Sequence, residues 1–156
     1  MDIAVTSVKI AALVANGILA GLSLDKVIVQ LPARRRIGVT AYAAYARAAD
    51  LGNGIAFYAA AGIGAAALTI AAFAVAAARQ AQGTVTALLA AAAALSLVHS
   101  ATTARAAPAM FKIGRAGNNP AVLEPLLTRF ARWSATRVVV QATTLILVAI
   151  AVAIRT

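Results

Sequence analysis

The sequence contains no cysteine and a single histidine, and charged residues make up 12% of its 156 positions. The missing cysteine excludes disulfides, thiolate metal sites and cysteine nucleophiles. One histidine and four scattered carboxylates fall short of the usual ligand sets for zinc or iron. Nucleotide-binding loops, nucleophile elbows and metalloprotease motifs are missing as well. We therefore expect no metal and no cofactor, although one histidine could serve as an axial haem ligand.

Hydrophobic residues, in contrast, make up 63% of the chain, against about 45–50% in a typical soluble domain. A transmembrane helix needs about 20 mainly apolar residues. Four windows qualify, at about residues 3–24, 51–78, 84–104 and 134–154. They predict an all-α fold, in which residues 1–156 form one integral-membrane bundle of four transmembrane helices.

Two long connections separate these windows, and we expect a short interfacial helix in each. Residues 37–49 are rich in alanine and contain Tyr42. Before Trp133, apolar and basic residues alternate so as to form two opposite helical faces. Aromatic and basic side chains are favoured at the membrane–water interface.

The basic residues are distributed unevenly about the four windows. Of the 14 Lys and Arg residues, all but Lys9, Arg79 and Arg155 lie in or beside the two long connections. Short loops rich in Lys and Arg stay in the cytoplasm, so we expect both long connections inside and both termini outside. The preference for arginine and alanine is typical of a high-GC bacterial genome, which suggests the bacterial inner (plasma) membrane. Anionic membrane lipids explain the net charge of +10 better than nucleic acid, for which no binding motif is present.

Small residues are abundant inside the windows. Gly17 and Gly21 form a GxxxG pattern, and Gly62 and Gly64 lie in the second window. Such residues let helix backbones approach closely in lipid. We expect these glycines to pack inside the bundle, and a homodimer face is the alternative.

Polar residues in the first window recur on one helical face. Lys9, Asn16, Ser23 and Gln30 are spaced by seven residues, which returns to nearly the same side of a helix. Polar groups at membrane depth are costly and usually face the interior of a bundle. This stripe therefore predicts the inward face of the first helix. Asp25 is expected on the other side, next to the glycines.

Similar stripes on the other helices predict one polar site in the cytoplasmic half. His99 is the only side chain here with an ordinary pKa near neutrality. Arg137 needs a counter-charge, for which Asp25 or Asp50 is expected, and a structural ion pair is the favoured interpretation. Asp50 could instead cap the second helix. The candidate catalytic residues are His99, Arg137 and Tyr58, and the candidate substrate-binding residues are Asp25, Asp50, Asn53 and Gln141.

The chain resembles the anthrone-oxygenase-like family of small four-helix membrane proteins, largely a domain of unknown function. The resemblance rests on residues 31–36 (LPARRR), the alanine-rich segment after them, and Trp133 with Arg137 at the start of the last window. It implies, for some members, oxidation of a lipophilic anthrone to a quinone by molecular oxygen. His99 would then remove a proton, and Arg137 with Tyr58 or Gln141 would stabilise the oxyanion.

Two other classes of function stay open. A non-enzymatic accessory or scaffolding subunit would pack against a larger membrane-protein partner through the small-residue faces. A transporter or channel is less well supported, because the outer half offers no polar path except near Lys9 and Asn16.

Overall fold

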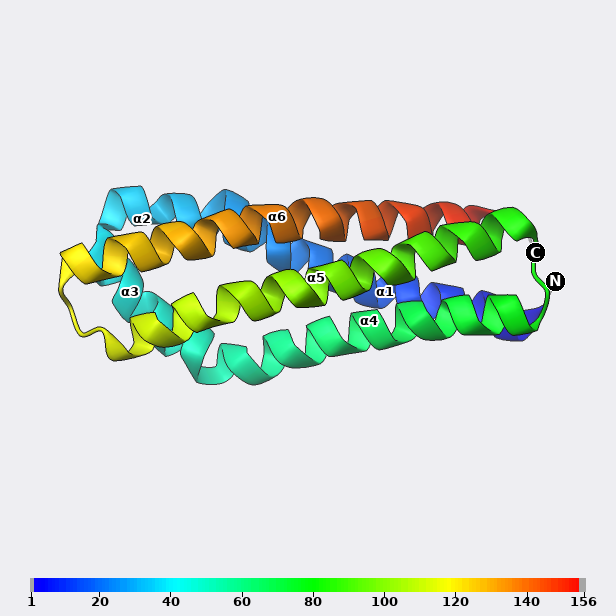
Figure 1. Cartoon of the computed structure of the whole chain (residues 1–156), viewed down its shortest axis with the longest axis horizontal. Coiled ribbons are helices and arrows are strands. Elements are labelled where there is room, and N and C mark those ends of the chain that lie inside the picture. The colour runs from blue at the N-terminus through cyan, green and yellow to red at the C-terminus, as the bar shows by residue number, and fades with distance from the viewer. Residues whose placement is uncertain (1, 155–156) are drawn as a thin grey trace.

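The computed structural model describes residues 2–154, and these residues form four long helices. Each of the four is long and apolar enough to cross a membrane, which indicates a multi-pass membrane protein. The predicted all-helical bundle of four such helices is confirmed (Figure 1). The first long helix comprises α1 (Ile3–Leu24), the π-helical segment η1 (Asp25–Gln30) and α2 (Leu31–Ile37). The second comprises α3 (Val39–Ala48), the π-helical segment η2 (Ala49–Asn53) and α4 (Gly54–Ala78). The third is α5 (Gly83–Arg115), and the fourth is α6 (Pro120–Ala153).

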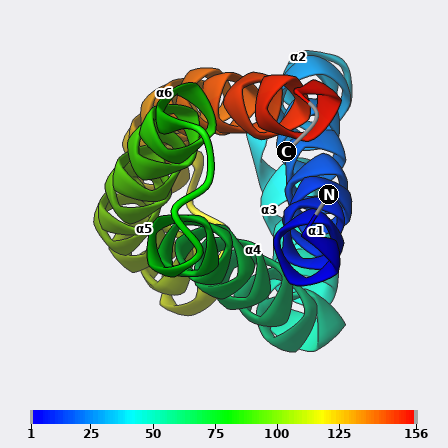
Figure 2. The same ribbon diagram turned by 90° about the vertical axis from the view of Figure 1, so that its right-hand side faces the viewer.

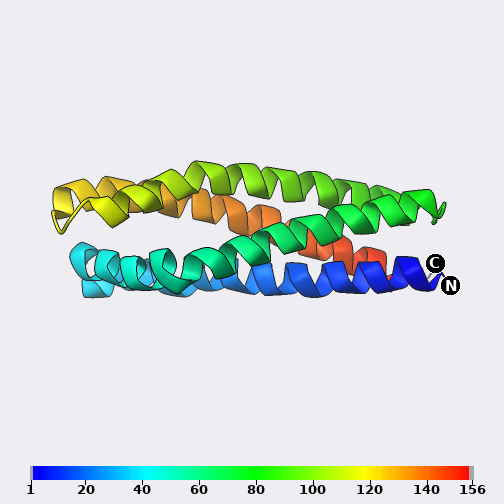
Figure 3. The same ribbon diagram turned by 90° about the horizontal axis from the view of Figure 1, so that it is seen from below.

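Tight turns connect the long helices in an up-down-up-down order. Gly38 alone joins α2 to α3, with a positive φ of 84° that glycine adopts without steric cost. Residues 79–82 join α4 to α5, and residues 116–119 join α5 to α6. Both termini lie at one end of the molecule, together with the 79–82 turn (Figures 1 and 3). We call this the terminal end and the opposite end the basic end. The basic end carries Arg34, Arg35, Arg36, Arg47, Lys112, Arg115, Arg129 and Arg132.

Seen along the bundle axis, the four long helices form the sides of a ring (Figure 2). The first packs against α4 and α6, and α5 packs against the same two helices. Helices distant in sequence, such as α1 and α6, are therefore direct neighbours in the ring.

The helices continue well beyond the apolar windows. The long connection expected between the third and fourth windows is largely helical, because α5 runs to Arg115 and α6 already begins at Pro120. Pro120 occupies the first turn of α6, where its missing N–H is harmless. The short interfacial helices that we predicted are not shown: α3 continues through η2 into α4, and the segment before Trp133 belongs to α6.

Two apolar clusters fill the interior, one near each end. The cluster at the terminal end contains Val5, Ala12, Ala72, Ala76, Val85, Leu89, Ala92, Val148 and Ala151. The cluster at the basic end contains Tyr42, Ala43, Ala46, Ala106, Ala109, Met110, Ile113, Leu123, Leu127 and Phe130. This second core explains the helical extensions, because burial of an apolar face stabilises helix more than intrinsic propensity does.

The predicted polar stripe of the first helix faces the interior. Lys9, Asn16 and Ser23 are all buried. The Nζ of Lys9 donates to the carbonyl oxygens of Ala151 (2.9 Å) and Ile154 (3.3 Å). Lys9 thus satisfies carbonyls at the end of α6 that lack partners within the helix. Arg155, the other basic residue expected here, lies outside the described residues.

The glycines behave differently from our prediction. A Cβ atom added at Gly17, Gly21, Gly62 or Gly64 would meet no atom within 4 Å apart from the local helix backbone. The expectation that these glycines pack closely inside the bundle is therefore wrong: they lie where the described chain leaves open space. Gly54 is the contrary case, since its added Cβ would lie 2.5 Å from the carbonyl oxygen of Ala49.

Candidate functional site

Buried polar side chains from all four long helices lie between the two apolar clusters. We call this set the polar layer. Its buried members are Asn16, Ser23, Lys26, Asp50, Thr69, Ser96, His99, Thr102, Ser134, Gln141 and Thr144. Partly buried Tyr58 and Arg137 adjoin it. Polar groups inside an apolar bundle require partners, so the contacts of each member decide its role.

The part of the layer nearer the terminal end is a closed hydrogen-bond network. Asn16 Nδ2 donates to Thr69 Oγ1 at 2.7 Å. Gln141 Nε2 donates to Asn16 Oδ1 at 2.9 Å and to the Asn16 carbonyl oxygen at 3.3 Å. The network ties α1, α4 and α6 together. Because both amide hydrogens of Gln141 are engaged, its side chain is a structural link here rather than a free donor for a substrate.

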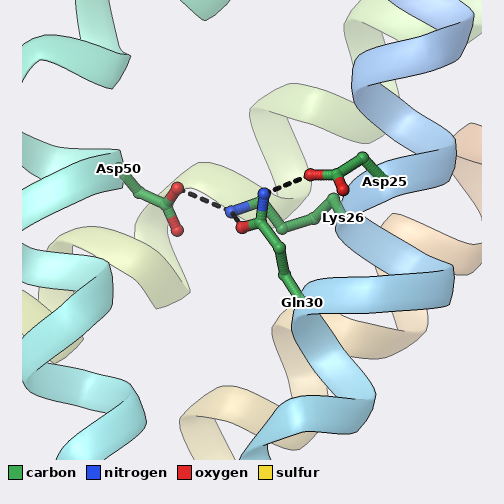
Figure 4. Close-up of polar contacts among 4 residues, drawn as sticks. All are labelled: Asp25, Lys26, Gln30 and Asp50. Carbon is green, nitrogen blue, oxygen red and sulfur yellow. Dashed lines mark hydrogen bonds and ion pairs between the residues drawn. The ribbon is translucent and has the colours of Figure 1, made fainter.

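A buried ion pair joins the first two long helices nearer the basic end. Lys26 Nζ lies 2.6 Å from Asp50 Oδ1, and both side chains are less than 10% exposed. The same ammonium donates to Oε1 of Gln30, and the amide nitrogen of Gln30 donates to the carboxylate of Asp25 (Figure 4). The chain of contacts runs from exposed Asp25 to buried Asp50.

Both halves of this ion pair lie on π-helical segments. Lys26 belongs to η1 and Asp50 to η2, and Gly52 within η2 has non-helical angles (φ −85°, ψ −120°). Single π-helical turns inside α-helices are rare and are frequent at functional sites. Asp50 Oδ1 accepts from Lys26 and Oδ2 has no partner, so no backbone N–H of the described residues donates to this carboxylate. The prediction that Asp50 caps a helix N-terminus is therefore wrong. Asn53 closes η2 and is exposed.

The centre of the layer lies between α5 and α6. His99 is 6% exposed and lies beside Arg137. Ser134, one turn before Arg137 on α6, is almost fully buried. The guanidinium carbon of Arg137 lies 5.9 Å from the centre of the Phe130 ring. Tyr58 completes this region from α4, because Asp50 and Arg137 both lie within electrostatic range of it.

Of the seven candidate residues, His99 lies beside Arg137, and Asp50 and Tyr58 lie within electrostatic range of Arg137. Asp25 and Asn53 are exposed, and Gln141 belongs to the separate network. The sequence-based selection did not include Lys26, Thr69 or Ser134. Lys26 was recognisable as a neighbour of the polar stripe, three residues after Ser23, and Thr69 as the single threonine in the second apolar window.

Arg137 does not form the ion pair expected of it. Within residues 2–154 the ion pairs are Lys26–Asp50 and Arg79–Asp2. Asp50 is engaged by Lys26, which reaches it from the neighbouring helix. The expected pairing of Arg137 with Asp25 or Asp50 is therefore wrong, and the guanidinium has no carboxylate partner among the described residues.

Several buried polar atoms in this region lack a hydrogen-bond partner in the described part of the chain. They are Asp50 Oδ2, His99 Nδ1, Ser134 Oγ and Arg137 Nε, with Tyr42 Oη and Arg34 Nη1 nearer the basic end. Leaving one such atom unsatisfied costs about 1–3 kcal/mol, and native proteins tolerate few of them. Their gathering between two apolar clusters favours a role in binding polar atoms from outside the chain.

Residues 2–154 contain no group of three His, Cys, Asp or Glu side chains that could bind a metal ion. Two open surface depressions lie at the basic end, and neither is lined by His99, Arg137 or Tyr58.

Comparison of the chain with protein-family models, curated proteins and solved structures found no match.

Proposed function

We propose that this chain is a bacterial inner-membrane protein that binds a lipophilic aromatic molecule through the polar layer and oxidises it without a cofactor. The observation that carries the proposal is the group of buried, unpartnered polar atoms on Asp50, His99, Ser134 and Arg137. Burial of each such atom without a partner is costly, so a molecule that supplies hydrogen-bonding atoms would stabilise this region. A lipophilic body with polar oxygen atoms would complement both these unpartnered atoms and the apolar clusters on either side.

The distribution of charge supports a defined orientation in the membrane. The basic end would face the cytoplasm, and both termini would lie outside. With a rise of 1.5 Å per residue, the 33 residues of α5 extend over about 50 Å, which exceeds a hydrocarbon core of about 30 Å. The basic end would therefore reach the headgroups and beyond. The polar layer would lie in the cytoplasmic half, within reach of molecules dissolved in that leaflet.

The residues of the layer support oxidation of an activated C–H bond by molecular oxygen. Neutral His99 would accept a proton from the substrate carbon at Nδ1, which has no partner. The Arg137 guanidinium and the Tyr58 hydroxyl would stabilise the resulting enolate oxygen. The carbanion carbon would then bond to one atom of O₂. Cleavage of the O–O bond and loss of the second C–H proton give a carbonyl and one molecule of water.

Anthrone is a suitable test substrate, because its oxidation to anthraquinone consumes one O₂ and releases one water. Purified protein in mild detergent should accelerate oxygen uptake and quinone absorbance together. His99→Ala should lower the rate at least tenfold, since general-base catalysis typically contributes 10²–10⁴-fold. Ser100→Ala is the matched control, because Ser100 Oγ only bonds back to the Ser96 carbonyl of its own helix. Full activity in a folded His99→Ala protein would refute the assignment.

A non-enzymatic accessory role is the second candidate, and the open glycines favour it. Gly17 and Gly21 on α1, and Gly62 and Gly64 on α4, leave space that a helix of another membrane protein or of a second copy could fill. Purification in mild detergent discriminates between the two functions. A lipophilic molecule extracted from the protein supports the first, whereas a stoichiometric partner lost in Gly21→Leu supports the second.

A further inference from the structure

We infer that the molecule bound in the polar layer is a lipophilic anion, whose charged oxygen atoms are held by Arg137. This inference rests on the proposed function, in which the layer binds a lipophilic molecule, and it adds the charge of that molecule. The reason is that the polar layer contains one more cation than the chain can neutralise.

The chain has four acidic residues, and of these only Asp50 is a member of the polar layer. Asp2 lies at the terminal end and pairs with Arg79. Asp25 is exposed, and its carboxylate accepts a hydrogen bond from a neighbouring glutamine of η1. Glu124 is also exposed and precedes Arg137 by 13 residues on α6, or about 20 Å along the helix. Among residues 2–154, none of the three forms an ion pair with Arg137.

The fourth carboxylate, Asp50, is already paired. It lies 2.6 Å from Lys26 and also within electrostatic range of Arg137. One carboxylate facing two cations leaves a net positive charge in the layer. His99 cannot supply a negative charge, because imidazole is either neutral or cationic. A net charge inside a bilayer protein is costly and normally attracts a counter-ion.

The geometry around Arg137 suits an anion held between α5 and α6. Arg137 Nε is buried without an acceptor, and Ser134 Oγ lies one turn earlier on the same helix, also without a partner. Nδ1 of His99 is the third unpartnered atom, contributed by α5. Arg137 Nε and Ser134 Oγ can each donate a hydrogen bond to oxygen, whereas His99 Nδ1, in its role as base, accepts the proton. A guanidinium with a second donor nearby suits the two oxygens of a carboxylate.

An anionic oxygen can come from two sources here. One is a free lipophilic acid, including an ionised phenol or enol; the other is the phosphate of an anionic membrane lipid. Both would neutralise Arg137 by the same contacts, and the composition of the membrane distinguishes them.

The test uses the full chain in nanodiscs of phosphatidylcholine, which has no net charge. The probes are 9-anthracenecarboxylate and its neutral analogue 9-anthracenecarboxamide, whose fluorescence reports binding. The wild type should bind the acid at least tenfold more tightly than the amide. Arg137→Gln should lose this preference and keep its affinity for the amide. Arg137→Lys, which retains the charge, should keep a preference, and Arg132→Gln is the exposed control that should match the wild type.

The outcomes separate the two levels of the proposal. Equal affinity of the wild type for the acid and the amide would overturn the inference that the bound molecule is an anion, but it would not contradict the proposed function. Binding of neither probe overturns both. A preference that persists unchanged in Arg137→Gln also overturns the inference. If phosphatidylglycerol added to the discs displaces the acid from the wild type, the anion is supported and its source is a lipid phosphate; without displacement, a free acid is supported.

Discussion

Lys26 and Asp50 form a 2.6 Å ion pair between η1 and η2, at the level where the first two long helices both depart from regular α-helix. A π-helical turn contains an extra residue and so rotates the side chains that follow it. In this bundle the two irregular segments face each other, and the ion pair joins them. The pair therefore marks the boundary between the polar layer and the apolar cluster of the basic end.

Removing Asp50 from this ion pair should destabilise the protein more than removing Lys26. Removal of one partner of a buried pair typically costs about 3–5 kcal/mol, because the other charge is left uncompensated. Asp50→Leu leaves the buried Lys26 ammonium without its carboxylate, so we expect the full loss. Lys26→Met should lower the free energy of unfolding by less, because the Asp50 carboxylate can then compensate the charge of Arg137. Thermal unfolding in one detergent would measure both. The double variant Lys26→Met/Asp50→Leu should be no less stable than Asp50→Leu alone; a lower stability would contradict this account.

The network between α1 and α4 should contribute modestly. Asn16 and Thr69 share a 2.7 Å hydrogen bond, and such interhelical bonds in membrane proteins average about 0.6 kcal/mol with a maximum near 1.7. A double-mutant cycle with Asn16→Ala and Thr69→Ala should give a coupling energy in this range. Thr143→Ala is the control, because its exposed hydroxyl bonds only to the Val139 carbonyl of α6. Zero coupling would mean that the bond does not stabilise the fold.

The sequence predicted the architecture well, since its determinants are local. Windows of about 20 apolar residues fixed the four helices, and the seven-residue spacing of Lys9, Asn16 and Ser23 identified the inward face of the first. The helical extensions were missed because prolines and glycines suggested loops. Pro120 instead lies at the start of α6 and Pro125 in its second turn, while apolar residues beneath them pack as a core.

The partners within the site were harder to predict than its members. His99, Arg137, Tyr58 and Asp50 were all selected from the sequence, yet Arg137 was expected to pair with Asp25 or Asp50. The actual pairing depends on η1 and η2, which shift the register of two helices at one level. Propensities of single residues do not encode such a shift, because it follows from how two helices pack.

Gly54 should be intolerant of a side chain, whereas Gly62 should accept one. An added Cβ at position 54 would lie 2.5 Å from the Ala49 carbonyl oxygen, and at position 62 it would meet nothing within 4 Å apart from the local helix backbone. We expect Gly54→Ala to destabilise by about 1–3 kcal/mol, the usual cost of overpacking. Gly62→Ala should be neutral or stabilising by up to about 1 kcal/mol, because alanine favours helix. Thermal unfolding of the two variants checks this, and equal melting temperatures would contradict the close approach at η2.

The orientation of the bundle can be tested cleanly, because the chain has no cysteine to give background labelling. Ala121 is exposed near the start of α6 at the basic end, and Gln82 is exposed in the turn before α5 at the terminal end. With the basic end in the cytoplasm, a membrane-impermeant maleimide should label Gln82→Cys in intact cells and should label Ala121→Cys only after permeabilisation. The reverse pattern would put the basic end outside. The polar layer would then be accessible from the outer leaflet, since it lies toward the same end as the basic residues.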